Sequence, residues 1–317
     1  MQKSMREKIS TYYNKFGIFV ILIALMVVCS ILSPKFLTHN NIKNVLRQLA
    51  VVVILACGMQ HLLIAGMIDL SAGSMIALSG CFGVSVYVHT LNMALAIGTS
   101  MITGAVAGIL IGLVITRFNI PPFIATLAMN TAAQGGALLF TNGRPISGIG
   151  KLAVLGQGYV GTIPIPIIIM FACIVIDWIV LTKTRYGRYL YAIGGNQEAS
   201  VACGINAKRI RVVAYIISGF FAGLAGITMM ARVNSGQPTV GPGYEFDAIT
   251  AVVVGGTSMS GGSGSIWGTF VGGLIVCIIN NILNLKNVSS YYQQIVSGLI
   301  ILLAVLIDTL TKGGKRD

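Results

Sequence analysis

Long apolar runs, each interrupted by Pro, Gly or charged residues, follow one another along almost the whole chain of 317 residues. Several runs reach about 18 residues, the length that an α-helix needs to cross the hydrocarbon core of a bilayer. The pattern predicts about ten membrane-spanning helices, over residues 17–33, 46–66, 72–90, 92–116, 121–140, 163–182, 212–231, 246–260, 266–284 and 292–310. The third and eighth of these are short or rich in Gly and Ser, so we expect some short or broken helices.

Composition excludes a soluble protein. Hydrophobic residues make up 55% of the chain and charged residues only 9%, with a mean hydropathy of +0.86. A soluble domain carries about 25% charged residues and alternates polar and apolar faces along its helices. The chain is therefore predicted to be an all-α polytopic membrane protein. Because no hydrophilic stretch is long enough for a second domain, residues 1–317 are predicted to form one transmembrane domain.

The distribution of positive charge predicts the orientation of the helices. Lys and Arg accumulate in cytoplasmic loops of membrane proteins. With the N-terminus inside, the two tails, residues 117–120 and residues 183–211 hold 14 of the 21 Lys and Arg residues. Both termini are therefore expected in the cytoplasm, with loop 183–211 on that side and loop 141–162 outside. The net charge of +13 has this explanation and predicts no nucleic-acid partner.

No enzyme site is recognisable in the sequence. The six cysteines form no CxxC pair, and His39, His61 and His89 share no metal-ligand spacing, so we expect no metal site. No P-loop, nucleophile–base pair or other catalytic group stands out. A chain without its own ATPase site, catalytic residues or cofactor is therefore predicted.

Loop 183–211 contains the sequence YAIGGNQEASVACGINAKRIR at residues 191–211. Gly195 ends one segment there, Asn196 is a good helix N-cap, and Glu198 would lie in the first turn, where the helix dipole favours an acid. Gly204 fits the end of the helix. A helix of about seven residues is therefore predicted on the cytoplasmic side, and its small, apolar face around Ala199 suits insertion into a partner.

The segment GMIDLSAGS, residues 66–74, places an acid between two apolar runs. Asp69 is expected near an interface, where it would mark a helix break and cap N–H groups of the following helix. The alternative is a substrate or gating contact, because a carboxylate in the bilayer is costly enough to suggest a function. Asp177, in a more apolar setting, is expected to face another helix or the interface.

Small and polar residues within the spans predict helix contacts and a pathway. Gly104, Gly108 and Gly112, then Gly219 and Gly223, form GxxxG steps, which allow helices to approach closely. Hydroxyl and amide side chains could hold a neutral polar solute weakly, as broken helices in transporters do. The pathway candidates, besides Asp69, are Ser71, Ser74, Asn130, Gln134, Thr257, Ser258 and Asn280, with polar helix–helix contacts as the competing interpretation.

The chain resembles the permease subunit of ribose-type ABC sugar importers, which depend on a binding protein. The matching stretches run in order through nearly the whole chain: GMIDLSAGS, PPFIATLAM, FTNGRP, TRYGRYLYAIGGNQEASVACGINAKRI, QPTVGPGYEFDAITAVVVGGTSMSGGSGSIWGT and NNILNLKNVSSYYQQIVSGLIILLAVLID. The resemblance implies a ten-span fold with an internal inverted repeat in the bacterial inner membrane. It also implies a homodimer or close pair of permeases, two ATPase subunits that bind the ATP, and an external sugar-binding protein.

The same resemblance assigns the helix that seats in the ATPase to Gly195, Asn196, Glu198, Ala199, Gly204 and Ile205. The function it implies is ATP-driven import of ribose or a similar monosaccharide. A self-sufficient proton- or ion-coupled carrier is the alternative. Such a carrier would need an intramembrane acid opposite substrate or a basic partner. The spans offer Asp69 and Asp177 but no Lys or Arg to pair with them, which favours the ATP-driven permease.

Overall fold

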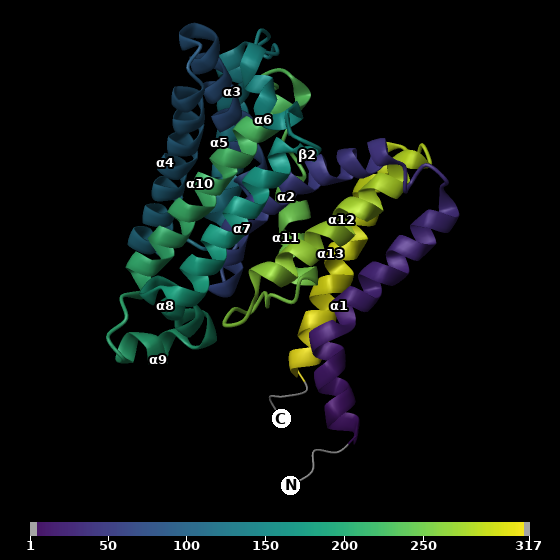
Figure 1. Ribbon diagram of the computed structural model, residues 1–317. Coiled ribbons are helices and arrows are strands. Elements are labelled where there is room, and N and C mark those ends of the chain that lie inside the picture. Colours follow the sequence, from purple (N-terminus) through teal and green to yellow (C-terminus); the bar gives the residue numbers. More distant parts are fainter. Residues whose placement is uncertain (1–4, 314–317) are drawn as a thin grey trace.

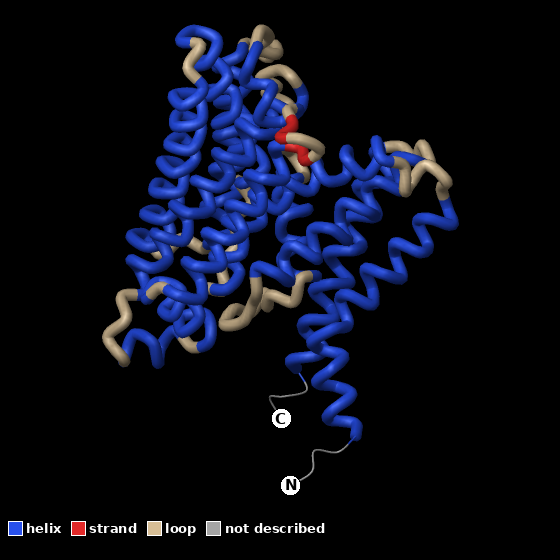
Figure 2. Tube along the Cα trace, in the orientation of Figure 1, coloured by secondary structure: helices blue, strands red, loops and turns tan. Residues whose placement is uncertain are grey.

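The computed structural model describes residues 5–313 and is almost entirely helical (Figure 2). The first four and last four residues, which carry Lys3, Lys315 and Arg316 of the predicted cytoplasmic tails, lie outside it. The long helices are α1 (Met5–Leu32), α2 (His39–Ile64), α3 (Ala72–Thr90), α4 (Met93–Phe118), α5 (Pro122–Thr141), α7 (Ile165–Lys183), α10 (Ala207–Val233), α12 (Ile266–Leu285) and α13 (Ser290–Gly313). The shorter elements are η1 (Gly150–Ala153), α6 (Val154–Gln157), β1 (Tyr159–Val160), β2 (Ile163–Pro164), α8 (Arg185–Gly195), α9 (Gln197–Ala202) and α11 (Tyr244–Val254).

Within the described residues, seven of these helices are long and apolar enough to cross a membrane, namely α2, α3, α4, α5, α7, α10 and α12. Shorter apolar stretches, Gly17–Leu32 of α1 and Tyr291–Leu303 of α13, account for two more predicted spans. The all-α polytopic fold is therefore confirmed. The third predicted span, 72–90, coincides with α3, whereas α2 begins seven residues before its predicted start, at His39.

The eighth predicted span is wrong in its extent. Residues 246–260 were expected to be helical, but α11 covers only Tyr244–Val254. The helix ends because Gly255 and Gly256 follow it, and Gly256 has φ +89°, a left-handed conformation that glycine adopts without strain. With 11 residues, α11 is too short to cross a bilayer alone.

The helices form two groups, with α2 running between them (Figure 1). One group contains α3, α4, α5, α7 and α10, and the other contains α1, α12 and α13. The first turns of α1 and the last turns of α13 lie at the same end of the molecule as α8 and α9. The two ends of the described chain therefore lie on one side of the bundle, and the membrane face on which they lie stays a prediction.

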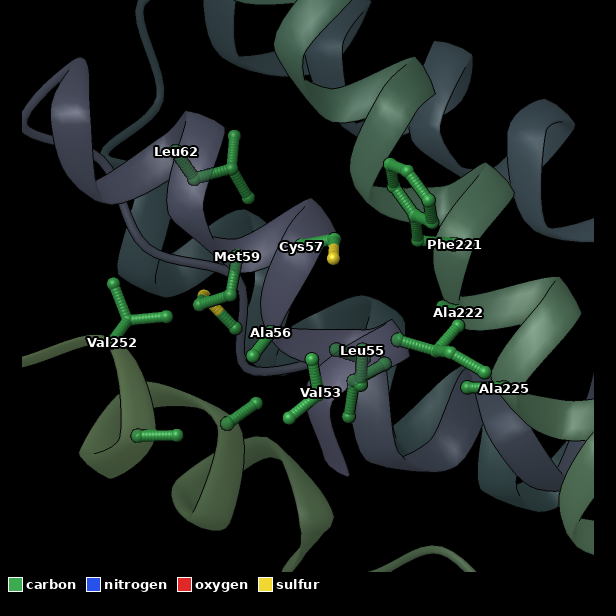
Figure 3. Close-up of a cluster of buried hydrophobic side chains, with 14 of the residues drawn as sticks. Val53, Leu55, Ala56, Cys57, Met59, Leu62, Phe221, Ala222, Ala225 and Val252 are labelled. Carbon is green, nitrogen blue, oxygen red and sulfur yellow. The ribbon is translucent and has the colours of Figure 1, made fainter. Parts of the chain in front are cut away.

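The helix α2 forms the centre of the core. Its residues from Leu49 to Ile64 are all buried, and a helix that is apolar on every side is stable only when other helices surround it. Cys57 faces Phe221 of α10, while Met59 faces Val252 of α11 (Figure 3). Both groups of helices therefore pack against α2.

The predicted GxxxG steps join α4 to α10. A Cβ atom on Gly104 would collide with the carbonyl oxygen of Gly219, and one on Gly219 would collide with that of Gly104. Gly108 lies equally close to the backbone of Tyr215, and Gly223 to that of Ser100. Since apolar lipid gives little hydrophobic drive for helix association, this close backbone packing stabilises the pair.

Candidate functional site

A cavity of about 760 Å³, lined by both polar and apolar groups, lies where the start of α11 meets α12 and α13. Its lining contains two carboxylates, several amides and two aromatic rings: Gln48, Pro242, Gly243, Tyr244, Glu245, Phe246, Asp247, Asn280, Asn284, Gln293, Gln294, Ser297, Gly298 and Ile301. The volume is typical of a small-molecule site. No Lys or Arg occurs in the lining, so the cavity suits a neutral polar solute better than an anion.

The sequence before α11 creates the start of this helix inside the bundle. Gly241 and Gly243 have φ +131° and +98°, so the segment 238–243 turns sharply before the helix begins. Glu245 and Asp247 occupy the first turn, where the helix dipole favours acids. The Gly243 N–H donates to a Glu245 carboxylate oxygen at 3.0 Å. Asn280 of α12 donates to the Asp247 carboxylate at 3.5 Å, a long contact that leaves both groups available to a solute.

A second helix break, between α2 and α3, meets the first. A Cβ atom on Gly73 would lie 2.7 Å from the carbonyl oxygen of Gly241, and one on Gly241 would strike the carbonyl oxygen of Gly73. Only glycine permits this approach of two backbones. One break follows α2 and separates the second predicted span from the third. The other follows α10 and separates the seventh predicted span from the eighth.

Asp69 stabilises the break after α2. Its Oδ1 accepts hydrogen bonds from the Ser71 N–H at 2.8 Å and the Ser71 hydroxyl at 2.6 Å, and its Oδ2 accepts from the Ser218 hydroxyl at 3.1 Å. The predicted helix break is present, and the acid bonds the N–H of the residue that precedes α3. The bond from Ser218 places Asp69 beside the middle of α10, whereas its position relative to the membrane interface stays a prediction.

The predicted pathway residues are divided between the cavity and helix contacts. Asn280 lines the cavity. Asp69 and Ser71 lie in the break after α2, and Ser258 is buried. The remaining candidates bond other parts of the chain: Ser74 bonds Asn130, Gln134 donates to the Pro238 carbonyl at 2.9 Å, and Thr257 accepts from Gln60 at 2.9 Å. None of these lines the cavity. Their part in a pathway stays a prediction.

The predicted cytoplasmic helix is present as α9, with six residues. Asn196 is its N-cap and accepts a hydrogen bond from the Ala199 N–H at 2.9 Å, and Glu198 lies in the first turn. Gly204 follows with φ +84°, and the Ile205 N–H donates back to the Ser200 carbonyl at 3.0 Å. The docking role of Gly195, Asn196, Glu198, Ala199, Gly204 and Ile205 stays a prediction.

Several polar residues of the structure were not singled out in the sequence. Gln48, Asn284, Gln293 and Gln294 line the cavity, and Gln60 connects α2 to Thr257 and Thr269. Gln48 and Gln60 are polar positions within one apolar run, which was the available signal. His61 bonds Asp177 of α7, so Asp177 does face another helix. Single-sequence periodicity does not identify such a pair, because its members are 116 residues apart.

Comparison with known proteins identifies the family of this chain. The family described as "branched-chain amino acid transport system / permease component" matches residues 41–305. The ribose import permease of Bacillus subtilis (strain 168) is 46% identical over 298 residues, which cover 93% of this chain and 92% of the relative. The ribose import permease of Escherichia coli K12 is 43% identical over 294 residues, covering 91% and 92%.

The D-allose transport system permease of Escherichia coli K12 is 36% identical over 304 residues, covering 94% of this chain and 93% of the relative. No solved structure matches the chain. The family matches residues 41–305, which is most of the chain, and the relatives align over nearly their whole length. The chain therefore belongs to this family of ABC transporter permeases.

Proposed function

We propose that this chain is the membrane subunit through which an ATP-driven importer passes ribose or a similar monosaccharide into the cytoplasm. The observation that carries the proposal is the cavity lining, with carboxylates and amides but no Lys or Arg. Sugar hydroxyls both donate and accept hydrogen bonds, so they match these groups. Phe246, which is exposed into this region, offers an aromatic face for the apolar side of a sugar ring.

A branched-chain amino acid, the solute in the family description, fits this lining less well. Its carboxylate requires a cation or free N–H donors, and its side chain requires an apolar pocket. Glu245 and Asp247 already occupy the first turn of α11, where an anionic group would otherwise bind. The three relatives named above are permeases for ribose and D-allose by their names. Both arguments favour a neutral sugar.

In this proposal the remaining parts of the importer are separate chains. Two ATPase subunits bind ATP and seat on α9, so the chain itself needs no cofactor and has no ATPase site. A sugar-binding protein docks outside, on the loop 141–162. That loop is tied to α2, because Arg47 donates to the Gln157 carbonyl at 2.8 Å and its guanidinium lies 5.0 Å from the centre of the Tyr159 ring. The chain acts in the bacterial inner membrane, with both termini in the cytoplasm.

The proposal includes a single transmembrane domain with an inverted repeat, and a second permease copy or a paired permease beside it. The two helix breaks support the repeat, because each follows the second helix of its half. The exposed apolar side chains of α13, among them Leu299, Leu302 and Leu303, lie beside the cavity residue Ile301 and suit a partner chain or lipid. The pathway would then be completed between two chains.

Reconstitution tests the function. The chain, its ATPase and its binding protein are assembled in proteoliposomes, and uptake of labelled ribose, D-allose and leucine is measured with and without ATP. Uptake of a monosaccharide that requires ATP and the binding protein is expected. Uptake driven by a proton gradient without the ATPase would instead establish the secondary carrier, and uptake of leucine alone would exclude the sugar assignment.

A further inference from the structure

Three polar side chains meet inside the apolar core, away from the cavity. His61 is one turn from the end of α2, Asp177 lies in α7, and Tyr186 lies in the first turn of α8. The His61 Nε2 is 2.5 Å from the Asp177 Oδ1, and its Nδ1 is 3.2 Å from the Tyr186 hydroxyl. His61 is 0% exposed and Asp177 1% exposed. We call these three residues the α2–α8 clasp.

One tautomer of His61 satisfies both contacts of the α2–α8 clasp. With a proton on Nε2, His61 donates to the Asp177 carboxylate, and Nδ1 accepts from the Tyr186 hydroxyl. Burial raises the pKa of the Tyr186 hydroxyl, and the Asp177 carboxylate raises it further, so this donor keeps its proton. Each ring nitrogen of His61 therefore has one partner, on a different helix.

The clasp is strong because its surroundings are apolar. Among the described residues, Asp177 Oδ2 has no hydrogen-bond partner, so His61 provides the one bond that holds this buried carboxylate. The buried thiols of Cys57 on α2 and Cys173 on α7 are among the groups near this carboxylate. In such surroundings a polar bond is costly to break, because water does not replace the lost partner.

The helix that the clasp holds leads directly into α9. Only Asn196 separates the end of α8 from the start of α9. The end of α8 also packs on the end of α2, since a Cβ atom on Gly194 would collide with the Ile64 carbonyl oxygen. Tyr191 of α8 donates to the Gly264 carbonyl at 2.9 Å, in the loop after α11. A displacement of α9 therefore reaches α2 and this loop through short contacts.

The helix α2, which contributes His61 to the clasp, also contributes to the lining of the cavity near its other end. Gln48 of α2 lines the cavity, and Gln60, adjacent to His61, bonds Thr257 in the loop after α11 and Thr269 in α12. The buried helix α2 thus connects the clasp to the segment that forms the cavity. Because a packed helix moves as a rigid element, a shift at one end of α2 also displaces its other end.

We propose that His61, Asp177 and Tyr186 are positioning residues that tie α8 and α9 to α2, so that movement imposed on α9 by ATP hydrolysis opens or closes the sugar cavity. This role rests on the proposed docking of the ATPase on α9. None of the three residues lines the cavity, so they act through α2 rather than on the sugar.

The variant Tyr186→Phe removes a single hydroxyl and keeps the ring, so it tests the clasp without a large change in packing. The complete importer is reconstituted with ATPase and binding protein, and the number of sugar molecules transported per ATP hydrolysed is measured. We expect this ratio to fall about tenfold, as for the loss of one buried hydrogen bond, while ATP hydrolysis continues. Tyr189→Phe, on the same helix but 39% exposed, is the matched control and should keep the wild-type ratio.

His61→Asn, alone and combined with Tyr186→Phe in a double variant, tests whether Tyr186 acts through His61. If it does, His61→Asn and the double variant lower the ratio equally, because the Tyr186 hydroxyl contributes only when the imidazole is present. Hydrogen exchange gives a readout that needs no sugar. Backbone amides of α8 and α9 should exchange about tenfold faster in the Tyr186→Phe complex than in the wild-type complex.

A wild-type ratio and wild-type exchange in Tyr186→Phe would overturn the role of the clasp. So would transport and ATP hydrolysis that fall together, in proportion to the amount of complex assembled. Failure of the wild-type complex to move any monosaccharide would count against the proposed function instead. In that case the exchange of α8 and α9 still decides whether the clasp holds these helices.

Discussion

At the residue scale, buried acids in this permease are bound by donors of their own chain. Asp69 accepts three hydrogen bonds, and the Asp177 carboxylate is bonded to His61. A proton carrier needs an acid whose partners change during transport, whereas Asp69 serves the geometry of a helix break. The acids that face the cavity are Glu245 and Asp247, at the end of the predicted eighth span.

The bonds of Asp69 predict its effect on stability. Replacement by Ala leaves the Ser71 N–H and two buried hydroxyls without an acceptor, so the free energy of unfolding should fall by about 2–4 kcal/mol. Five of the six cysteines are buried and only Cys203 is exposed. Thermal unfolding can therefore be followed with a thiol-reactive dye in a Cys203→Ser background. An unchanged unfolding temperature would show that the break does not depend on the carboxylate.

The position of Asn280 predicts a transport defect. This residue lines the cavity and contacts Asp247 through its amide. Asn280→Leu should lower ATP-driven sugar uptake about tenfold, because the substitution removes a polar group from the cavity lining and the amide that donates to the Asp247 carboxylate. Binding-protein docking and assembly should stay unchanged, as measured by copurification. Asn92→Leu, at the exposed cap of α4, controls for loss of an amide elsewhere.

At the scale of elements, the sequence predicts the positions of most helices along the chain but not which helices pack against one another. The apolar runs predicted α3 to its exact residues, and the cap residues of α9 predicted its start and end. The eighth span was overextended because Val252–Val254 continue into Gly255–Gly256 without a charge. The cavity depends on Gln48, Asn280 and Gln293, which three separate helices bring together, and one sequence has no signal for that arrangement.

The contact between α4 and α10 predicts a specific packing defect. Gly219→Ala places a methyl group against the backbone of Gly104, so it should destabilise the protein by about 1–3 kcal/mol. Gly135→Ala is the matched control, since its added Cβ would meet nothing within 4 Å in helix α5. This control should be neutral or slightly stabilising, because Ala favours helix over Gly. Equal unfolding temperatures for the two variants would contradict the close packing.

The cap of α9 predicts the result of a proline substitution. Ala199→Pro removes the N–H that Asn196 binds, so the helix should lose its first turn and ATP-driven transport should be abolished. Gln197→Pro, at the first helical position, is tolerated by helix geometry and should retain more transport. Membrane insertion of both is checked by fractionation. Normal transport by Ala199→Pro would rule out a docking role for α9.

At the scale of the whole molecule, the position of Cys203 predicts which side of the membrane α9 faces. The exposed Cys203 follows α9 and should face the cytoplasm. In the permease without its ATPase, a membrane-impermeant maleimide should label Cys203 in inside-out vesicles and not in intact cells. A Gly161→Cys variant in the hairpin between β1 and β2, made in a Cys203→Ser background, should show the reverse pattern. Labelling of Cys203 from outside would invert the topology.

The short helix α11 has a consequence for leakage. With a rise of about 1.5 Å per residue, its 11 residues extend about 16 Å, roughly half the hydrocarbon thickness. If water fills the cavity at the start of α11, the membrane voltage falls across the length of this helix rather than across the full bilayer. The insulating layer is therefore thin at the point of passage. Under the proposed function, opening or closing a pathway across this layer requires a smaller movement than a pathway across the full bilayer would.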